Sequence, residues 1–411
     1  MSSVELAPHA RPSRRTAAAR NADFIVFAVN GFALASWMSR VPDVREALTL
    51  TPGELSVLLL AISAGSLCGL PVAGRIANRW GAAATVRLGM AIGLVGFLLA
   101  ALAVTLGDSV YLVMPGLFLA GLGSGVWDVA QNLEGTIIER ELGRAIMPWF
   151  HAAFSAGTVV AALLGAVLTW LKVPILWHIG VVVVLGAAGV LWATTRFLHG
   201  SGEAEAQAAS PEPRTRQRSA WTEPRTLLIG LMVLAAAFTE GTANDWMAVA
   251  FVDGHHLPNA VGVVALAVFL AFMTAGRILG TRLLDRYGRI PVLRILFGAA
   301  LVGCALVVFG TAPLAFVGAA IWGLGASLGF PVGMSAAADD PARAPLRLSV
   351  VSTIGYGAFL AGPPLLGFLG DHVGVLRALT VVGAVSLLAM LVVPAARPLP
   401  AETDAEVDAK A

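Results

Sequence analysis

Long runs that contain no Asp, Glu, Lys or Arg constrain this chain more than any other feature of its sequence. Most of these runs are close to the ~20 apolar residues that a helix needs to cross a bilayer. Only 13% of the 411 residues are charged and 57% are hydrophobic, whereas a soluble domain has about 25% charged residues. A water-soluble core cannot absorb this much apolar sequence, so the expected solvent is a lipid bilayer.

The runs predict twelve membrane spans. They lie at residues 24–39, 55–74, 88–107, 109–127, 145–171, 173–195, 226–239, 254–276, 295–338, 348–370 and 378–396. The run 295–338 counts as two spans, because the turn signal Gly-Thr-Ala-Pro lies near its middle. The run 226–239 is short only because Glu240 and Asp245 interrupt a longer apolar segment. Continuous apolar runs favour helices over the alternating strands of a barrel.

The predicted fold class is therefore an all-α membrane protein with twelve transmembrane helices in two six-helix bundles. A polar stretch rich in Gly, Pro, Glu and Arg separates the sixth span from the seventh, and its composition is typical of a flexible linker. The expected segments are a cytoplasmic arm (1–21), a first bundle (22–196), a cytoplasmic linker (197–225), a second bundle (226–396) and a cytoplasmic tail (397–411).

The basic residues predict the orientation of the spans. With twelve spans, 22 of the 27 Lys and Arg residues fall on the side that holds both termini, and 4 fall on the other side. Loops rich in Lys and Arg stay in the cytoplasm, so we expect a multi-pass protein of the cell (inner or plasma) membrane with both termini cytoplasmic. The net charge of +2 is too balanced for a nucleic-acid binder, and the two cysteines form no cluster with metal-ligand spacing.

The two halves of the chain repeat each other. The loop at 74–81 (GRIANRWG) corresponds to the loop at 281–289 (TRLLDRYGR) with an offset of 207 residues, and Gly69 corresponds to Gly276 at the same offset. The sequence Gly-Leu-Gly at 121–123 recurs at 323–325. Parallel six-span repeats are typical of transporters, whose substrate site lies at the interface between the repeats.

Residues 20–396 resemble the major facilitator superfamily, whose loops after the second and eighth spans carry Gly-x-x-x-Asp-Arg-x-Gly-Arg. This chain has Asn78 in place of the acid in the first copy and Thr281 in place of the leading Gly in the second. The resemblance implies that the loops form a cytoplasmic gate, with Arg277 as a nearby partner. The other candidate gate residues are Gly74, Asn78, Arg79, Asp285, Arg286 and Arg289. Alternatively, basic residues such as Arg79 anchor the loops to anionic lipid.

Asp128 is the strongest candidate for a proton-coupling site. It follows nineteen uncharged residues, and a charge at the centre of a span costs at least ~2.5–3.5 kcal/mol unless it finds a partner or a wet cavity. Its neighbours Trp127 and Asn132 add an aromatic surface and an amide, which suit a polar solute. The alternative is a static ion pair with a neighbouring helix. Glu134 lies nearer the cytoplasmic end, where an interfacial role is favoured.

Two segments resemble the fucose–proton symporter branch of that superfamily. Residues 125–132 (GVWDVAQN) are similar to its fourth span, which implies that Asp128, four residues before Asn132, carries the coupled proton. Residues 151–157 (HAAFSAG) are similar to a fifth-span segment whose first residue, here His151, contacts the sugar. His151 is otherwise a hydrogen-bonded packing residue. Met38 stands where the branch has a second acid, so fucose itself is not implied.

The seventh span carries further polar residues. Glu240 and Asn244 are one helical turn apart and share a face, whereas Asp245 lies on a different side of the helix. We expect all three to line the cavity. The candidate substrate-binding residues are thus Trp127, Asn132, His151, Glu240, Asn244 and Asp245.

These features predict a monomeric secondary active transporter of a small polar organic solute, driven by protons through alternating access, with no cofactor and no metal. The sequence lacks a phosphate-binding Gly-x-x-x-x-Gly-Lys-[Ser/Thr] motif and any evident catalytic set, which argues against an ATP motor and against an enzyme. The alternative is a proton-driven efflux antiporter for drugs or metabolites. Such antiporters carry an Arg where Leu117 stands and a proline that residues 157–165 lack. A membrane enzyme or a transport-inactive receptor on the same fold is the third possibility.

Overall fold

Helices make up almost all of the computed structural model, which describes residues 13–107, 110–143, 146–198, 219–340 and 343–399. The first half contains α1 (Arg14–Met38), α2 (Val41–Ala47), α3 (Pro52–Leu106), α4 (Val110–Leu142), α5 (Met147–Trp170) and α6 (Ile175–Thr194). The second half contains η1 (Ala220–Thr222), α8 (Pro224–His255), α9 (Asn259–Tyr287), α10 (Arg289–Phe309), α11 (Ala312–Ala326), α12 (Gly329–Ala337), α13 (Ala344–Val373), α14 (Val375–Ala378), α15 (Thr380–Val392) and η2 (Val393–Ala396). Much of the predicted arm, linker and tail lies outside the described residues.

Eleven segments of the described chain are long and apolar enough to cross a membrane. One of them, α3, has 55 residues and contains both the second and the third predicted span. Its only break is Gly81, whose φ of 79° and ψ of 166° lie in a region that favours glycine. Gly288, between α9 and α10, adopts φ 77° and ψ 171°. The two glycines are 207 residues apart, so the backbone confirms the internal repeat.

Close helix contacts at glycines follow the same repeat. A Cβ atom at Gly121 of α4 would collide with the carbonyl oxygen of Ile62 on α3, and one at Gly323 of α11 would collide with that of Phe269 on α9. Ile62 and Phe269 are again 207 residues apart. Small residues let helix backbones approach closely, which is how helices associate in a membrane.

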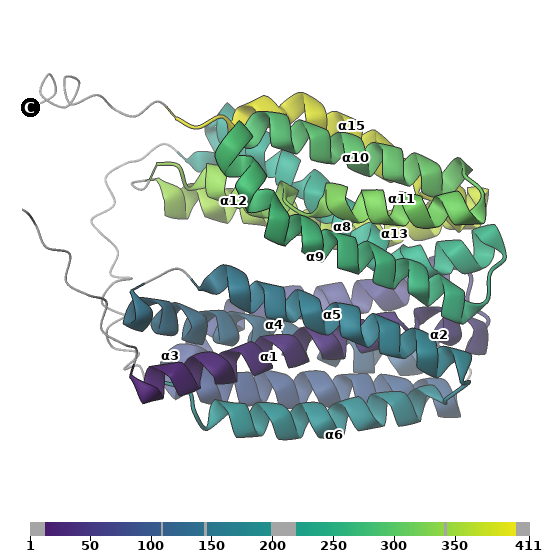
Figure 1. The fold of residues 1–411 in the computed structure, drawn as a ribbon. Coiled ribbons are helices and arrows are strands. Elements are labelled where there is room, and N and C mark those ends of the chain that lie inside the picture. The colour runs from purple at the N-terminus through teal and green to yellow at the C-terminus, as the bar shows by residue number, and fades with distance from the viewer. Residues whose placement is uncertain (1–12, 108–109, 144–145, 199–218, 341–342, 400–411) are drawn as a thin grey trace, which may run out of the picture.

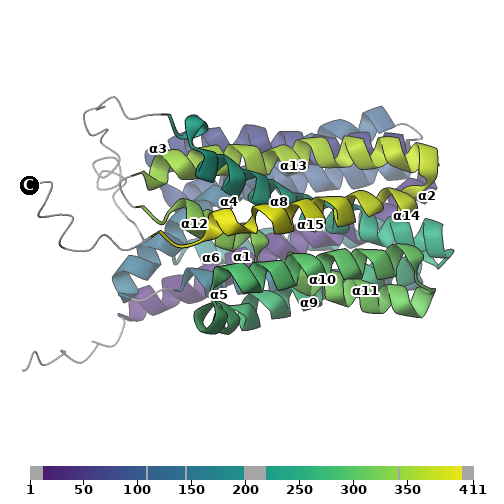
Figure 2. The ribbon, with the colours of Figure 1, turned by 90° about the horizontal axis from the view of Figure 1, so that it is seen from above.

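The helices α1 to α6 lie in the lower part of Figure 1 and α8 to α15 in the upper part. The two groups meet where α5 packs against α9 and α3 packs against α13. We call the end at which α1 begins and η2 ends the terminal end, and the opposite end, which carries α2 and α14, the distal end. Figure 2 shows the same lengthwise arrangement from above.

The Gly121 contact provides a test of this packing. We expect Gly121→Ala to destabilise the protein by about 1–3 kcal/mol, because an added methyl group would force α3 and α4 apart. Gly180→Ala in α6 is the matched control, since no heavy atom lies within 4 Å of the added Cβ. Thermal melting of both variants in detergent measures the difference, and equal melting temperatures would contradict the close contact.

Candidate functional site

Asp128 lies in α4 and is half-buried. Its Oδ1 accepts hydrogen bonds from Gln131 Nε2 at 3.1 Å and from Asn132 Nδ2 at 3.3 Å. Asn132 Nδ2 also donates to the backbone oxygen of Asp128 at 2.8 Å. Within the described residues Asp128 has no ion-pair partner, so the predicted alternative of a static ion pair finds no support. Two neutral amides hold the carboxylate without cancelling its charge.

The amide chain continues from α4 to α1. Asn30 Nδ2 donates to Gln131 Oε1 at 3.4 Å, and both side chains are buried. On another side of Asp128, Tyr356 of α13 lies within electrostatic range of the carboxylate. Asp128 is therefore linked to α1 by hydrogen bonds and lies within electrostatic range of a side chain of the second half.

Arg277 of α9 binds Glu240 of α8. Its Nη2 donates to both carboxylate oxygens of Glu240, at 2.8 and 2.9 Å, and its Nε donates to the backbone oxygen of Ser327 at 3.3 Å. The side chains of Arg277 and Glu240 are 30% and 21% exposed to solvent. The pair therefore keeps part of its surface exposed.

Pro331 explains why Ser327 can bind Arg277. In a continuous helix the backbone oxygen of Ser327 would accept a hydrogen bond from the N–H of residue 331, but proline has none. The chain accordingly breaks between α11 and α12, at Ser327 and Leu328. Arg277 supplies the donor that Pro331 lacks.

His151 connects the two groups of helices. It lies in α5, is exposed, and its ring centroid is 5.4 Å from that of Phe27 in an edge arrangement. Arg277, from the facing helix α9, is within electrostatic range of His151. Arg277 therefore pairs with Glu240 and lies within electrostatic range of His151, on two helices, α9 and α5, that pack against each other.

The other predicted substrate residues differ in their exposure. Trp127 is 2% exposed and belongs to the hydrophobic core, so it does not contact a cavity in this conformation. Its size and apolar ring make such burial favourable. Asn244 is half-buried with an Oδ1 that has no hydrogen-bond partner. Asp245 is half-buried and has no ion pair or hydrogen bond to the described residues.

The predicted gate residues do not form one cluster. Gly74, Asn78, Arg79, Asp285 and Arg286 are exposed, and the guanidinium of Arg286 lies 5.2 Å from the Tyr287 ring centroid. Arg277 pairs with Glu240 in this conformation, and among the described residues no hydrogen bond or ion pair joins it to the loop residues. A role for these loops as a gate stays a prediction.

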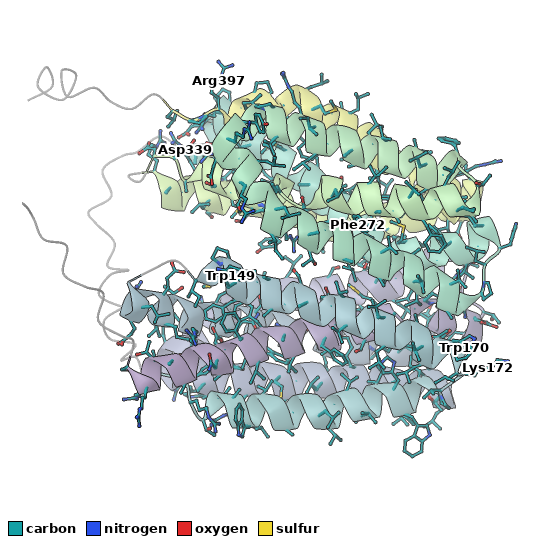
Figure 3. The ribbon with its side chains drawn as sticks, viewed as in Figure 1. Trp149, Trp170, Lys172, Phe272, Asp339 and Arg397 are labelled. Carbon is teal, nitrogen blue, oxygen red and sulfur yellow. The ribbon has the colours of Figure 1, made fainter. Side chains whose placement is uncertain are left out.

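Arg289 instead joins a charge network at the terminal end of the second half. Its Nη1 donates to Asp339 at 2.7 and 3.0 Å, and Arg225 Nη2 donates to the same carboxylate at 2.8 Å and to the Arg397 backbone oxygen at 3.0 Å. Figure 3 places Asp339 and Arg397 at this end, opposite Trp170 and Lys172. In the same network Glu223 binds Arg343 at 2.6 Å and Arg347 at 2.7 Å.

Contacts between the two halves gather at the distal end. Arg45 of α2 forms an ion pair with Asp253 of α8. Asn259 Nδ2 donates to Asp43 at 2.9 Å and to Glu46 at 2.7 Å. The backbone N–H of Gly53 also donates to Asp371 of α13, at 3.1 Å. Among the described residues, the hydrogen bonds and ion pairs that join the halves are at this end, so this conformation is closed there.

Several of these residues were not predicted from the sequence. Asp43, Asp253 and Asn259 lie in short loops or at helix ends, where a search for charges inside spans does not look. Asn30 is uncharged and therefore hidden in an apolar run, although it could have been noticed as an amide in the first span. Within the described chain no group of three His, Cys, Asp or Glu residues could hold a metal ion.

Comparisons with known proteins identify the class. The Major Facilitator Superfamily profile matches residues 24–341 and 258–411, so the chain belongs to this superfamily of membrane transporters and is not an enzyme. An uncharacterized MFS-type transporter of Yersinia pestis is 30% identical over 379 residues, covering 91% of this chain and 94% of its own length. A chloramphenicol resistance protein of Streptomyces lividans is 29% identical over 375 residues, covering 86% and 89%.

Two solved structures share the fold. A mutant of the nucleoside transporter NupG aligns with a TM-score of 0.74 and 14% identity, covering 93% of this chain and 100% of its own. A mutant of the fucose:proton symporter FucP of E. coli aligns with a TM-score of 0.60 and 14% identity, covering 91% and 97%. Transporters of this superfamily bind small-molecule substrates within the membrane, and the apolar helices make this chain an integral membrane protein.

Glu223 makes the terminal-end network sensitive to pH. Burial alone would raise the pKa of Glu223, but hydrogen bonds from Arg347 and Thr226 and the charges of Arg347 and Arg343 outweigh it, so the pKa lies below its ordinary value of 4.5. A lowered folded-state pKa stabilises the protein above the ordinary value, and that stability is lost as the pH falls through the folded-state pKa.

We therefore expect Glu223→Gln to destabilise the protein by about 1 kcal/mol at pH 7, since the network lies near the surface. The difference from wild type should shrink as the pH falls below 4.5. Melting curves at a series of pH values test this. Asp285→Asn, which changes an exposed acid at the same end, should leave the pH 7 melting temperature unchanged. A Glu223→Gln deficit that persists in acid would contradict the proposed linkage.

Proposed function

We propose that this chain is a proton-coupled secondary transporter of a small polar organic solute that works by alternating access. The observation that carries the proposal is Asp128, a half-buried carboxylate in a membrane helix that is held by two amides and has no ion pair among the described residues. A carboxylate without a permanent counter-charge is free to gain and lose a proton as its surroundings change. No cofactor is needed, because the proton gradient supplies the energy.

The substrate site we propose lies between Asp128 and the group of His151, Glu240 and Arg277. These side chains come from α4, α5, α8 and α9, that is, from both halves of the chain. Amides, carboxylates and a guanidinium provide donors and acceptors for hydroxyl, amide or charged groups, which an apolar drug cannot use. Asn244, whose Oδ1 has no partner, supplies one more acceptor to the same region.

The topology we propose has twelve spans in two six-helix bundles, with α3 crossing twice through its break at Gly81. The distribution of Lys and Arg favours both termini in the cytoplasm of a cell (inner or plasma) membrane, and the protein acts as a monomer. In this topology the terminal end is cytoplasmic and the distal end faces outward. The distal contacts of Arg45, Asn259 and Asp371 then hold the outer gate closed.

Uptake into proteoliposomes under an imposed pH gradient tests the proposal. A panel of labelled sugars, nucleosides, organic acids and drugs should include at least one solute that accumulates only with the gradient. Ligand screening by thermal stabilisation would select the panel, because a ligand that binds the native state raises the melting temperature. A complete absence of gradient-dependent flux across the panel would remove the support for proton coupling.

We expect Asp128→Asn to abolish gradient-driven accumulation while substrate counterflow survives. The amide keeps the size of the side chain and an oxygen that can accept from Gln131 and Asn132, but it does not titrate. Counterflow requires no net proton movement. The paired measurement is accumulation and counterflow in the same proteoliposomes. Wild-type accumulation by the variant would show that the proton binds elsewhere.

Proton-driven efflux is the second candidate function. It is favoured by the likeness to a relative named as a chloramphenicol resistance protein. The polar side chains around Asp128 and Arg277 favour a polar solute instead. Inverting the pH gradient in the same proteoliposomes distinguishes symport from antiport, because the two mechanisms accumulate solute under opposite gradients.

The distal contacts predict a second variant. We expect Asn259→Ala to shift the population at least about tenfold toward a state open at the distal end, since hydrogen bonds to charged groups are worth about 1.5–3 kcal/mol. Hydrogen exchange measured by mass spectrometry should then become faster in α2 (Val41–Ala47). Asn21→Ala, which removes an exposed acceptor at the terminal end, is the control. Unchanged exchange in α2 would argue against a distal gate.

A further inference from the structure

A second pair of acids lies deeper in the first half than any other carboxylates described here. Asp23 of α1 and Glu134 of α4 are both 0% exposed. Both oxygens of Asp23 and the Oε2 of Glu134 have no hydrogen-bond partner. Glu134 Oε1 accepts the backbone N–H of Leu198, just after α6, at 2.6 Å. Three of the four carboxylate oxygens are thus buried and unsatisfied.

The two acids are neighbours in space. A Cβ atom at Gly135, the residue after Glu134, would lie 3.2 Å from Asp23 Oδ2, so the Asp23 side chain reaches α4 beside Glu134. Glu134 also lies within electrostatic range of Asp23. The walls around them are apolar, formed by Phe27, Ile138 and Phe150 with their neighbours.

Within the part of the chain that the structure describes, no cation forms an ion pair with Asp23 or Glu134. The charged or titratable side chains that the structure describes on the adjoining parts of α1, α3, α4 and α5 and after α6 are Arg15, Arg20, Arg87, Asp128, Glu139, Arg140, Glu141, His151 and Arg196; Arg87 donates to Thr194. Of these, Arg20 donates to Asn21, Glu139 accepts the N–H groups of Ile146 and Met147, and Arg196 donates to Trp192.

Two ionised carboxylates side by side in an apolar pocket, without a cation, repel each other and lack solvation. Paired acids in proteins resolve this conflict by sharing one proton. A proton makes one of the acids a donor, and the other acid then accepts the hydrogen bond. The unsatisfied oxygens of Asp23 and Glu134 fit this arrangement.

The pair also lies in line with Asp128. Along α4, Gln131 is about one turn from both Asp128 and Glu134, and the two acids are about 9 Å apart along the helix axis. Along α1, Asn30 lies two turns beyond Asp23, and it donates to Gln131. Nearer the terminal end, Thr16 Oγ1 donates to Glu141 at 3.4 Å. Polar groups therefore line the α1–α4 interface from Asp128 to the terminal end.

We propose that Asp23 and Glu134 bind one shared proton and pass protons between Asp128 and the compartment at the terminal end. In one step the O–H bond of the Asp128 carboxyl breaks, and a water beside Gln131 carries the proton to Glu134, where a new O–H bond forms. At the same time the O–H bond of the proton already shared by the acid pair breaks, and bulk water at the terminal end takes up that proton past Leu198, so each step moves one proton. The relay rests on the proposed proton coupling through Asp128, whereas the shared proton itself does not.

Infrared spectroscopy tests the shared proton without any transport. In an Asp128→Asn background, the spectrum at neutral pH should contain the C=O band of a protonated carboxyl group that shifts in D2O. Asp23→Asn and Glu134→Gln should each remove this band, and Glu141→Gln, a change of an exposed acid on the same helix, should keep it. If neither variant changes the band, the shared proton does not exist. A band difference that depends on Na⁺ rather than on pH would also overturn the proposal.

Transport tests the relay. In an otherwise wild-type chain, we expect Glu134→Gln to slow gradient-driven uptake by about a hundredfold, the typical contribution of a positioned proton-transfer group. Substrate counterflow and the melting temperature should stay within about twofold and a few degrees of wild type. Parallel loss of counterflow and of thermal stability would indicate a structural role and overturn the relay. Asp23→Asn repeats the test from α1.

The two proposals fail in different ways. If Asp128→Asn keeps its gradient-driven uptake, proton coupling through Asp128 is wrong and the proposed relay is wrong too. The infrared result still decides whether Asp23 and Glu134 share a proton. If Asp128→Asn loses uptake but Asp23→Asn and Glu134→Gln keep it, the coupling stands and the relay is wrong.

Discussion

A charged group inside a bilayer has no water to solvate it, and this constraint explains the arrangement of the polar side chains. Arg277 is stabilised by two partners in place of water, Glu240 and the backbone oxygen of Ser327. Asp128 meets it with two amides, which leave its charge uncompensated. Asp23 and Glu134 meet it only in part, because most of their oxygens have no partner. These three solutions place a fixed charge pair, a single acid and an acid pair in one transporter, and among the described residues only the last two lack a cationic partner.

The fold follows from the sequence almost directly. The uncharged runs predict the membrane helices, and the offset of 207 residues between the loops recurs in the backbone angles of Gly81 and Gly288. These features are local, because a run of apolar residues or a glycine turn is visible in a short window of sequence. The break between α11 and α12 was not predicted, although Pro331 marks it.

The candidate site follows from the sequence only in part. Asp128 and Asn132 are one helical turn apart, so their contact could be predicted. Arg277 and Glu240 are 37 positions apart in the sequence and lie on two different helices. Such a contact depends on how helices pack rather than on spacing along one helix. Asp23 was missed for a different reason, since a search for uncharged runs treats an acid as the end of a span. The helix in fact begins at Arg14.

The proline in α12 has a consequence for recognition. Because Pro331 frees the Ser327 carbonyl group, the guanidinium of Arg277 is oriented by main-chain geometry as well as by a flexible carboxylate. A guanidinium group that is oriented by the backbone loses little rotational freedom when a solute binds. The selectivity of this transporter for its cargo would then depend on an N–H group that is absent from α12, although the arginine that it orients belongs to α9.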